Sequence, residues 1–247
     1  MRALLTLLTL LLALGPVRAD DDGGPYAKLD GLLRKHVDQS GMVDYKGLKQ
    51  QEQALRGVVA DLARADASKL EGAAKKAYWI NVYNALTLQA IVERYPLLRS
   101  IKDLNTKKYD VWKDYRFGPK KLSLNDIEHQ ILRPMGDPRI HSAIVCASKG
   151  CPPLRNEAYQ PGRLDAQLDA NVRTWLKSPT RGLRLEGDTL YLSSIFEWFG
   201  KDFGDGTTAA HLKWIARFVD DGGLEAKLLS GKLRVKSMDW DWSLNAQ

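Results

Sequence analysis

The stretch AYWINVYNALTLQAIV, residues 77–92, is apolar on almost every side when it is placed on a helix. A helix that is hydrophobic all round lies inside a protein, because none of its faces favours water. We therefore predict a buried central helix from about residue 71 to residue 94. Tyr95-Pro96 ends it, because a residue that precedes proline disfavours helical backbone. The apolar positions that fill it are Tyr78, Trp79, Ile80, Val82, Tyr83, Leu86, Leu88, Ile91 and Val92.

Three polar side chains interrupt this helix at intervals of three residues, namely Asn81, Asn84 and Thr87. A buried amide without a hydrogen-bond partner costs roughly 1–3 kcal/mol, so these side chains need partners inside the protein. Two interpretations stay open for the asparagines. Their amides either hold the backbone of a neighbouring loop or bind a substrate.

A second stretch, RIHSAIVCASKGCPPL at residues 139–154, contains both cysteines and one of the four histidines of the chain. Its apolar run at residues 140–145 predicts a short buried strand, and the residues after Cys146 predict a loop. This places His141 near the start of the strand and Cys146 at its end. If the protein has chemistry, we expect it here.

Cys146 and Cys151 are separated by four residues, and three roles for them stay open. Cys146 is either a thiol nucleophile, or the attacking thiol of a redox pair that Cys151 resolves, or one half of a structural disulfide. A structural disulfide here adds only about 2 kcal/mol, because a short loop closes little chain entropy. No second Cys or His pair stands at ligand spacing, so we expect neither a metal nor another cofactor.

A thiol nucleophile needs a base that raises its thiolate fraction. His141 is the nearest candidate in the sequence, and His129 beside Glu128 is the alternative. Side chains five positions apart on a regular strand point to opposite faces. His141 and Cys146 therefore meet only if the strand is bulged or has ended by Cys146.

The remaining pattern predicts a helical N-terminal half and short strands later in the chain. Residues 48–62 have the periodicity of an amphipathic helix, residues 112–122 that of a two-stranded ribbon, and residues 183–192 that of a hairpin. Two tryptophans in residues 239–245 indicate a C-terminal segment that docks against the body. No repeat or linker interrupts residues 26–247. We therefore expect one α/β (α+β) domain in which the central helix packs on a mainly antiparallel sheet.

The first residues have the pattern of a secretory signal peptide. An apolar segment at residues 4–14 follows a basic residue and precedes a small-x-small cleavage signal at residues 17–19. We predict that residues 1–19 are removed by cleavage after Ala19, that residues 20–25 form a flexible mature terminus, and that the protein is periplasmic or secreted. The apolar segment is shorter than the ~20 residues that span a bilayer, so no stable membrane insertion is expected.

The charge of the chain is +7, from 37 basic and 30 acidic residues. The two signs are interspersed along the sequence, and basic doublets are isolated. A nucleic-acid surface needs basic residues gathered on one face. We therefore expect no nucleic-acid partner.

Five segments, which together cover nearly the whole mature chain, resemble in their order and spacing the family called domain of unknown function 547. As the family's name says, this resemblance implies no settled activity. The segments are YWINVYNALT (78–87), LSLNDIEHQILR (122–133), DPRIHSAIVCASKGCPPLR (137–155), LYLSSIFEWFGKDFG (190–204) and DWSLN (241–245).

The chain resembles more distantly the papain and transglutaminase fold. That likeness implies a buried helix that bears the catalytic thiol and packs on a sheet whose first strand in the site supplies a histidine. This sequence departs from the pattern, because its buried helix carries Asn81 and Asn84 where the thiol would stand. The likeness implies either that the nucleophile has moved to Cys146 or that the site binds without catalysing.

We expect a thiol-dependent amide hydrolase or transferase that acts on peptide or cell-envelope material, with Cys146 as its nucleophile. In this role Asn81 and Asn84 would donate to the oxyanion or to the substrate amide. The alternative is a non-catalytic module whose groove binds a peptide or a small thiol peptide such as glutathione, with Asn81, Asn84 and Arg139 contacting its backbone or carboxylates. In that module Cys146 and Cys151 would form a structural disulfide.

Overall fold

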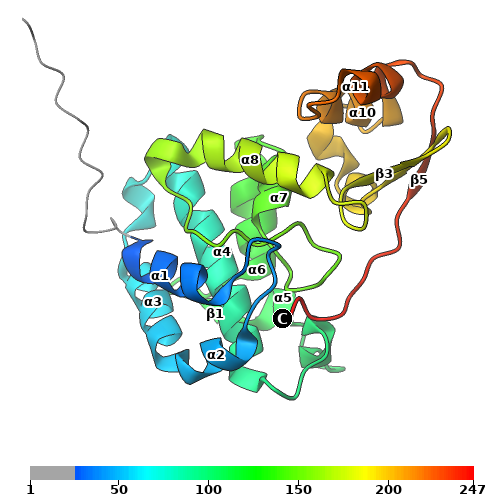
Figure 1. The fold of residues 1–247 in the computed structure, drawn as a ribbon. Coiled ribbons are helices and arrows are strands. Elements are labelled where there is room, and N and C mark those ends of the chain that lie inside the picture. Colours follow the sequence, from blue (N-terminus) through cyan, green and yellow to red (C-terminus); the bar gives the residue numbers. More distant parts are fainter. Residues whose placement is uncertain (1–25) are drawn as a thin grey trace, which may run out of the picture.

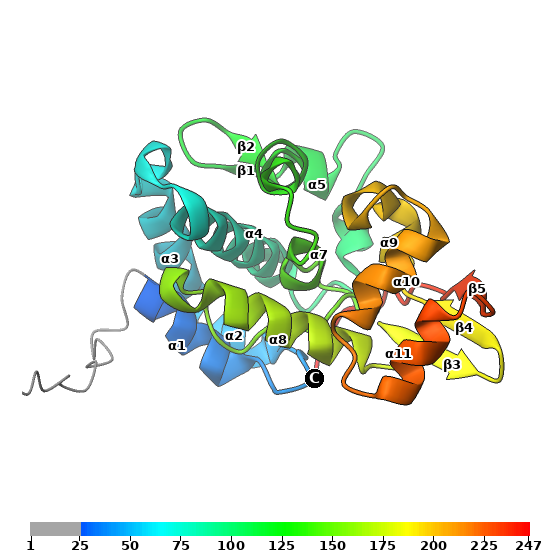
Figure 2. The same cartoon turned by 90° about the horizontal axis from the view of Figure 1, so that it is seen from above.

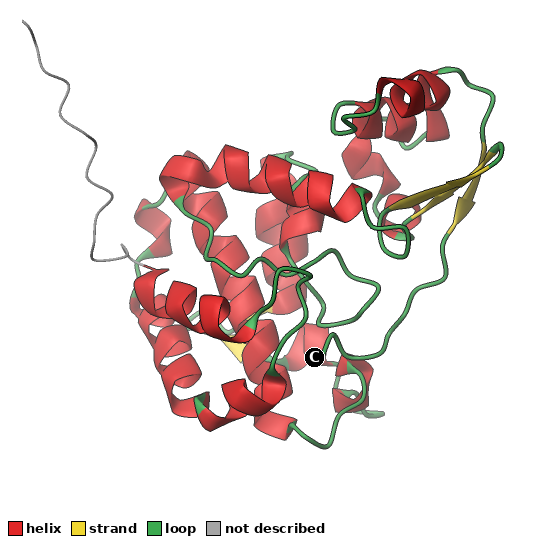
Figure 3. Ribbon diagram, in the orientation of Figure 1, coloured by secondary structure: helices red, strands yellow, loops and turns green. Residues whose placement is uncertain are grey.

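Within the part of the chain that the structure describes, most residues are helical and the strands form two small sheets (Figure 3). The computed structural model describes residues 26–247 (Figure 1). The predicted signal peptide at residues 1–19 and the predicted flexible terminus at residues 20–25 lie outside the described residues. Within the described part of the chain, no helix is long and apolar enough to cross a membrane.

The chain runs from a set of helices through a short ribbon and further helical turns to a C-terminal sheet with its own helices. The helical elements up to residue 143 are α1 (Ala27–His36), α2 (Tyr45–Gln50), α3 (Glu52–Arg64), η2 (Ala67–Lys69), α4 (Gly72–Arg94), η3 (Ile101–Leu104), α5 (Val111–Asp114), α6 (Leu124–Asp126), the π-helical turn η4 (Ile127–Leu132), η5 (Arg133–Met135) and α7 (Ile140–Ala143). The later ones are η6 (Pro161–Arg163), α8 (Leu164–Leu176), α9 (Ile195–Trp198), η7 (Gly200–Phe203), α10 (Thr208–Ala216) and α11 (Gly222–Leu229).

Helix α4 is the predicted buried helix, and 15 of its 23 residues are buried. It packs mainly against α3, α2, η4 and η6, so its partners are helices. The expected sheet does not cover it. The reason is length: α4 is about 35 Å long, whereas the longest strand has four residues and spans about 13 Å.

The strands form a two-stranded and a three-stranded sheet. The predicted ribbon is β1 (Arg116–Phe117) paired with β2 (Leu122–Ser123), and the predicted hairpin is β3 (Leu183–Glu186) paired with β4 (Thr189–Leu192), both antiparallel. Strand β5 (Arg234–Ser237) then adds to β4 in parallel. Two of the three pairings are therefore antiparallel, and the mixture of helices and small sheets confirms the α+β class and the single domain.

Two hydrophobic clusters lie side by side within this domain. The larger is built around α4 and its helical neighbours, and the smaller lies between the three-stranded sheet and the helices α9 to α11. Helix α8 joins them, because Leu164 and Leu168 pack in the larger cluster while Val172 and Trp175 pack in the smaller one. Figure 2 shows α8 running from the α1–α3 side of the molecule to the C-terminal helices.

The predicted strand at residues 140–145 is instead a single helical turn, α7, followed by extended backbone at Ile144. A short apolar run fits a buried helical turn as well as a buried strand, so periodicity alone does not separate them. Tertiary contacts decide the matter here, because α7 packs directly on α8. The strand geometry that separated His141 from Cys146 therefore does not apply.

The C-terminal segment docks along the cysteine loop, as the two tryptophans indicated. The amide of Lys149 donates to the carbonyl of Ser243 at 2.8 Å, and the amide of Gly150 donates to that of Asp241 at 2.8 Å. A Cβ atom at Gly150 would lie 2.9 Å from the ring of Trp240. Glycine is therefore needed there, because any side chain would push the tail away from the loop.

Candidate functional site

Asn81 and Asn84 of α4 each hold one backbone segment with both ends of the amide. The Nδ2 of Asn81 donates to the carbonyl of Tyr159 at 2.9 Å, while its Oδ1 accepts from the Tyr159 amide at 2.9 Å. Asn84 donates to the Ala143 carbonyl at 2.8 Å and accepts from the Val145 amide at 3.0 Å. The geometry favours loop anchoring over the expected substrate contact, and the Asn84 pair fixes the backbone that leads into the cysteine loop.

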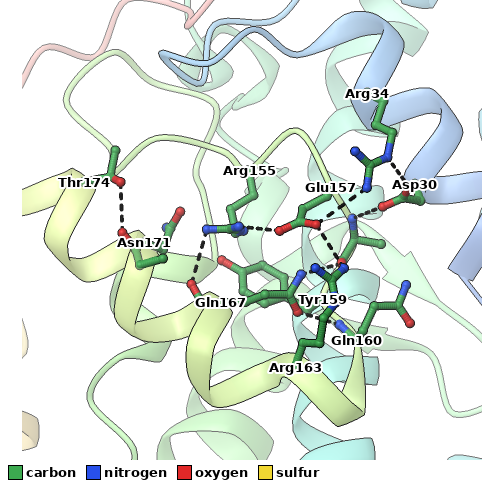
Figure 4. A network of polar contacts seen from close by, with 12 residues as sticks. Asp30, Arg34, Arg155, Glu157, Tyr159, Gln160, Arg163, Gln167, Asn171 and Thr174 are labelled. Carbon is green, nitrogen blue, oxygen red and sulfur yellow. Dashed lines mark hydrogen bonds and ion pairs between the residues drawn. The ribbon is translucent and has the colours of Figure 1, made fainter. Parts of the chain in front are cut away.

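The Tyr159 segment that Asn81 holds belongs to a wider polar network, shown in Figure 4. In this network Glu157 lies among three arginines, and Asp30 of α1 accepts from the amide of Ala158 at 2.8 Å. Burial raises the pKa of Glu157, but its hydrogen bonds, foremost with Arg155, outweigh this and hold the pKa at about 2. The network joins α1 and α8 to the loop at residues 157–160, so its role is structural.

Arg139, the third expected substrate contact, is also occupied by protein groups. Its guanidinium binds Asp137 at 2.8 Å, Asp165 at 2.7 Å and Asp169 at 2.7 Å. Burial raises the pKa of Asp137, but the bonds from Arg139 and Lys76 outweigh it and give a pKa of about 2. Through these ion pairs Arg139 joins α7 to α8, and its contact with a ligand stays a prediction.

The remaining candidates meet in one cavity of about 220 Å³, between the helical body, α9 and the C-terminal tail. Its walls include Glu128, His129, His141, Cys146 and Cys151. The sequence placed these residues on two separate segments. The cavity is completed by Tyr83, Trp112, Asn125, Ile144, Ile195, Trp198, Phe199, Trp240 and Trp242.

The two cysteines are adjacent and are both free thiols in this structure. Their Sγ atoms lie 2.6 Å apart, and the Cys146 amide donates to the Sγ of Cys151 at 3.0 Å. Cys146 is half-buried, and its Sγ contacts the hydroxyl of Ser148 at 3.0 Å, whereas Cys151 is only 5% exposed. The hydrogen bond from Cys151 lowers the pKa of Cys146, and burial raises the pKa of Cys151. Cys146 is therefore the thiol suited to act as a thiolate.

Glu128, on η4, is the carboxyl group that lines this cavity. Burial raises its pKa to about 7, although a hydrogen bond from the hydroxyl of Tyr83, at 3.2 Å, opposes the shift. When ionised, Glu128 raises the pKa of the Cys146 thiol by like-charge repulsion. It is thus a group that can exchange a proton near neutral pH beside a thiol.

His141 is buried, and its Nε2 lies 2.7 Å from Oδ2 of Asp202. Burial lowers the pKa of His141 to about 4, against the opposing effect of the bond to Asp202. The same carboxylate accepts from Nε of Arg133 at 2.6 Å and from its Nη2 at 2.8 Å. The ring also stacks on Phe199, with 4.4 Å between the centroids. His141 is therefore a neutral, fixed imidazole at neutral pH.

His129 lies at the exposed rim of the cavity. Its Nδ1 accepts from Nη1 of Arg133 at 2.8 Å. Burial and the neighbouring positive charge of Arg133 both lower the pKa of His129. The structure thus brings both candidate histidines to the cavity but links them to each other through Arg133 and Asp202.

Several residues of this site were not singled out from the sequence as site residues. They are Asp202, Arg133 and the four tryptophans that line the cavity, called the tryptophan wall below: Trp112, Trp198, Trp240 and Trp242. Asp202 lies 61 positions from His141 in the chain, so no local pattern could pair them. One signal was available, since Arg133 and Asp202 both fall within segments that carry the family resemblance. Among the described residues, no group of three or more His, Cys, Asp or Glu side chains is arranged to hold a metal ion.

The resemblance to a known family is confirmed over residues 67–176, which match the family described as "Protein of unknown function, DUF547". This range includes α4, Glu128, His141 and both cysteines, whereas Asp202 and the C-terminal tryptophans follow it. No curated protein and no solved structure matches the chain. The distant likeness to the papain and transglutaminase fold therefore stays a prediction.

Proposed function

For a chain whose residues 67–176 match a family of unknown function, we propose thiol-dependent amide hydrolysis or transfer, with Cys146 as the nucleophile. One observation carries this proposal. Cys146 is a half-buried thiol with a lowered pKa, and it opens into a cavity that also holds a carboxyl group whose pKa is about 7. A thiolate next to a proton donor is the pair that acyl transfer requires.

Cys146 and Glu128 together supply the nucleophile and the proton that cleavage of an amide requires. The Cys146 thiolate attacks the amide carbonyl, the C–N bond breaks, and a thioester forms on Cys146 while the leaving amine takes a proton. Glu128 supplies this proton, because its pKa of about 7 keeps a large fraction of it protonated at neutral pH. Water then attacks the thioester in a hydrolase, or a second amine does so in a transferase. Ionised Glu128 takes the proton of this nucleophile, the C–S bond breaks, and Cys146 leaves as the thiolate, which restores both groups.

His141 and His129 take other roles in this scheme. A pKa of about 4 leaves His141 neutral at pH 7, so it cannot donate a proton, but it can accept a hydrogen bond or orient water. His129 lies on the rim, where its Nδ1 accepts from Arg133, so its Nε2 carries the hydrogen and can donate a hydrogen bond to a bound group. Substrates would be peptides or cell-envelope amides.

Export forms part of the proposal, with the chain acting in the periplasm or outside the cell after cleavage behind Ala19. The support is the sequence pattern of residues 1–19. The intact mass of protein isolated from the native cell tests this point. A mass that includes residues 1–19 would contradict it.

A generic acyl donor tests the nucleophile without knowledge of the substrate. We expect p-nitrophenyl acetate to release a burst of nitrophenol and to leave an acetyl group on Cys146, seen by peptide mass mapping. Cys146→Ala should remove both signals, and Cys151→Ser, the matched control, should retain them because its hydroxyl can still donate a hydrogen bond to Cys146. Acetylation that persists at other positions with equal yield in Cys146→Ala would contradict the proposal.

A second candidate function is favoured by the 2.6 Å separation of the two sulfur atoms. Thiols at this distance are placed to form a disulfide, in which case the cavity would bind a peptide or a small thiol peptide such as glutathione without catalysis. Mass mapping of protein alkylated before purification separates the two functions. A Cys146–Cys151 disulfide in every molecule, together with full biological activity of Cys146→Ser, would favour binding.

A further inference from the structure

Aromatic side chains form a continuous surface on one side of the cavity. Four of the seven tryptophans of the chain line it. The ring centroids of Trp198 and Trp240 are 4.7 Å apart, those of Trp240 and Trp242 are 5.8 Å apart, and those of Trp112 and Trp242 are 6.2 Å apart. Trp198 is 47% exposed, although most large apolar side chains of the chain are buried. An exposed tryptophan at a cavity mouth is available to a ligand.

This aromatic surface already attracts one cation of the protein. The Nζ of Lys102 lies 3.5 Å from the ring centroid of Trp242. The negative face of an indole ring binds ammonium groups, and tryptophan does so more strongly than the other aromatic residues. The contact between Lys102 and Trp242 shows that one ring of this aromatic surface binds an ammonium group.

The cavity also has a negative group and no positive group of its own. Glu128 is the only carboxyl side chain that lines it, and no lysine or arginine of residues 26–247 is among its walls. The Oε2 of Glu128 accepts from Tyr83 at 3.2 Å, while Oε1 has no hydrogen-bond partner within the described residues. A carboxylate held in an apolar site is stable only when a positive charge faces it.

The nearest guanidinium does not fill this role. Arg133 lowers the pKa of Glu128 from a distance, but its Nε and Nη2 donate to Asp202 and its Nη1 donates to His129. Arg133 therefore gives Glu128 no hydrogen bond. Within the described residues, Glu128 has no direct bond from a positive side chain, in a cavity that four tryptophans also line.

We infer that this cavity is a binding subsite for an organic ammonium group, held between the tryptophan wall and the Glu128 carboxylate. The volume of about 220 Å³ suits a small group, since it is below the roughly 300–1,000 Å³ of sites for drug-sized ligands.

The subsite deepens the proposed function and rests on it for its role in turnover. When Glu128 gives its proton to the nitrogen and the C–N bond breaks, the products are the ionised Glu128 carboxylate and a neutral amine. The amine becomes an ammonium ion when it takes a second proton from solvent, and the tryptophans and the Glu128 carboxylate then hold this cation. The substrate class is therefore an amide of a small amine, with the amine portion on the tryptophan side of Cys146.

Binding of a permanent cation should depend on pH through Glu128. The groups that act on its charge are the Tyr83 hydroxyl from α4, the charged side chains of Arg133 and Asp202, and Cys146 when it is ionised. A cation favours the ionised carboxyl, which is the minor form below a pKa of about 7. Affinity should therefore fall as pH falls, by about tenfold between pH 8 and pH 6.

The test compares choline with 3,3-dimethyl-1-butanol, which has the same shape but no charge. Binding is followed by calorimetry and tryptophan fluorescence in the full chain carrying Cys146→Ala, so that the result does not depend on catalysis. We expect choline to bind at pH 8 at least tenfold more tightly than the neutral compound. Glu128→Gln should remove that preference, and Trp198→Leu should weaken choline binding severalfold.

Glu225→Gln is the matched control, because Glu225 is exposed on α11, away from the cavity. It should leave choline binding unchanged. Equal affinity for the two compounds, no binding of choline, or a preference that survives Glu128→Gln would overturn the inference. Choline binding in a chain whose Cys146 accepts no acetyl group would support the subsite while contradicting the proposed function, so the two failures are distinguishable.

Discussion

The asparagines on α4 are buried in the core, whereas the carboxyl of Glu128 is partly exposed in the neighbouring cavity, and the surroundings of these polar groups differ accordingly. Asn81 and Asn84 have both ends of their amides bonded to backbone. Glu128 has a single hydrogen bond, from Tyr83, and a pKa raised to about 7. Saturated hydrogen bonding marks a group that holds the fold, whereas an incompletely paired group in a cavity is available for chemistry.

Exchanging amide and carboxyl at these positions, with no change of volume, separates the two kinds of site. Asn84→Asp should lower the free energy of unfolding by about 4 kcal/mol, because it replaces a donor to the Ala143 carbonyl with a buried acid. Urea denaturation at pH 7 measures this. A loss under about 1 kcal/mol would mean that Asn84 does not anchor the loop.

The reverse exchange, Glu128→Gln, should raise stability at pH 8 by up to about 3 kcal/mol. A carboxyl whose folded pKa is raised to about 7 costs stability when it is ionised, and the cost grows as pH rises from about 4.5 through 7. The native chain should therefore lose stability over that window, and the variant should not. Urea curves at pH 5 and pH 8 test the sign, since equal gains at both values would contradict it.

The contact between the tail and the cysteine loop can be broken at one glycine. Gly150→Ala should cost about 2 kcal/mol, because its Cβ would lie 2.9 Å from Trp240 and 3.0 Å from the Asp241 amide. It should also expose the tail to proteases. Gly57→Ala in α3 is the control, since no atom lies within 4 Å of the added Cβ. That change should stabilise the chain by about 0.5–1 kcal/mol.

The smallest effect concerns the thiol itself. Glu128→Gln should lower the pKa of Cys146 further, because it removes a neighbouring negative charge. The rate of alkylation as a function of pH gives this shift. An unchanged midpoint would place Glu128 too far from the sulfur to act on it.

The sequence was sufficient for features that depend on local pattern. The apolar positions of residues 77–92 predicted α4, and alternating leucines predicted the β3–β4 hairpin. The requirement that Asn81 and Asn84 find partners followed from their burial alone. The sequence also identified the stretch that carries both cysteines, and it named Glu128, His129 and His141, all of which line the cavity.

Other features depend on contacts that no local pattern records. The apolar run at residues 140–145 fits a strand or a helical turn equally well, and packing on α8 selects the turn. The bond between His141 and Asp202 joins residues 61 positions apart. Trp240 and Trp242 also line the cavity. Their aromatic character predicted that the tail docks on the body, but no local pattern predicted which residues it meets there.

The pH dependence of Cys146 alkylation tests the central claim, an activated thiol, most directly. Native protein kept reduced is treated with iodoacetamide between pH 5 and pH 9, and each cysteine is followed by mass mapping. We predict that Cys146 reacts with a midpoint below the value of about 8.5 for a free thiol, while buried Cys151 stays unlabelled. A Cys146 rate that is flat across this range, or that rises only above pH 8.5, would contradict the account.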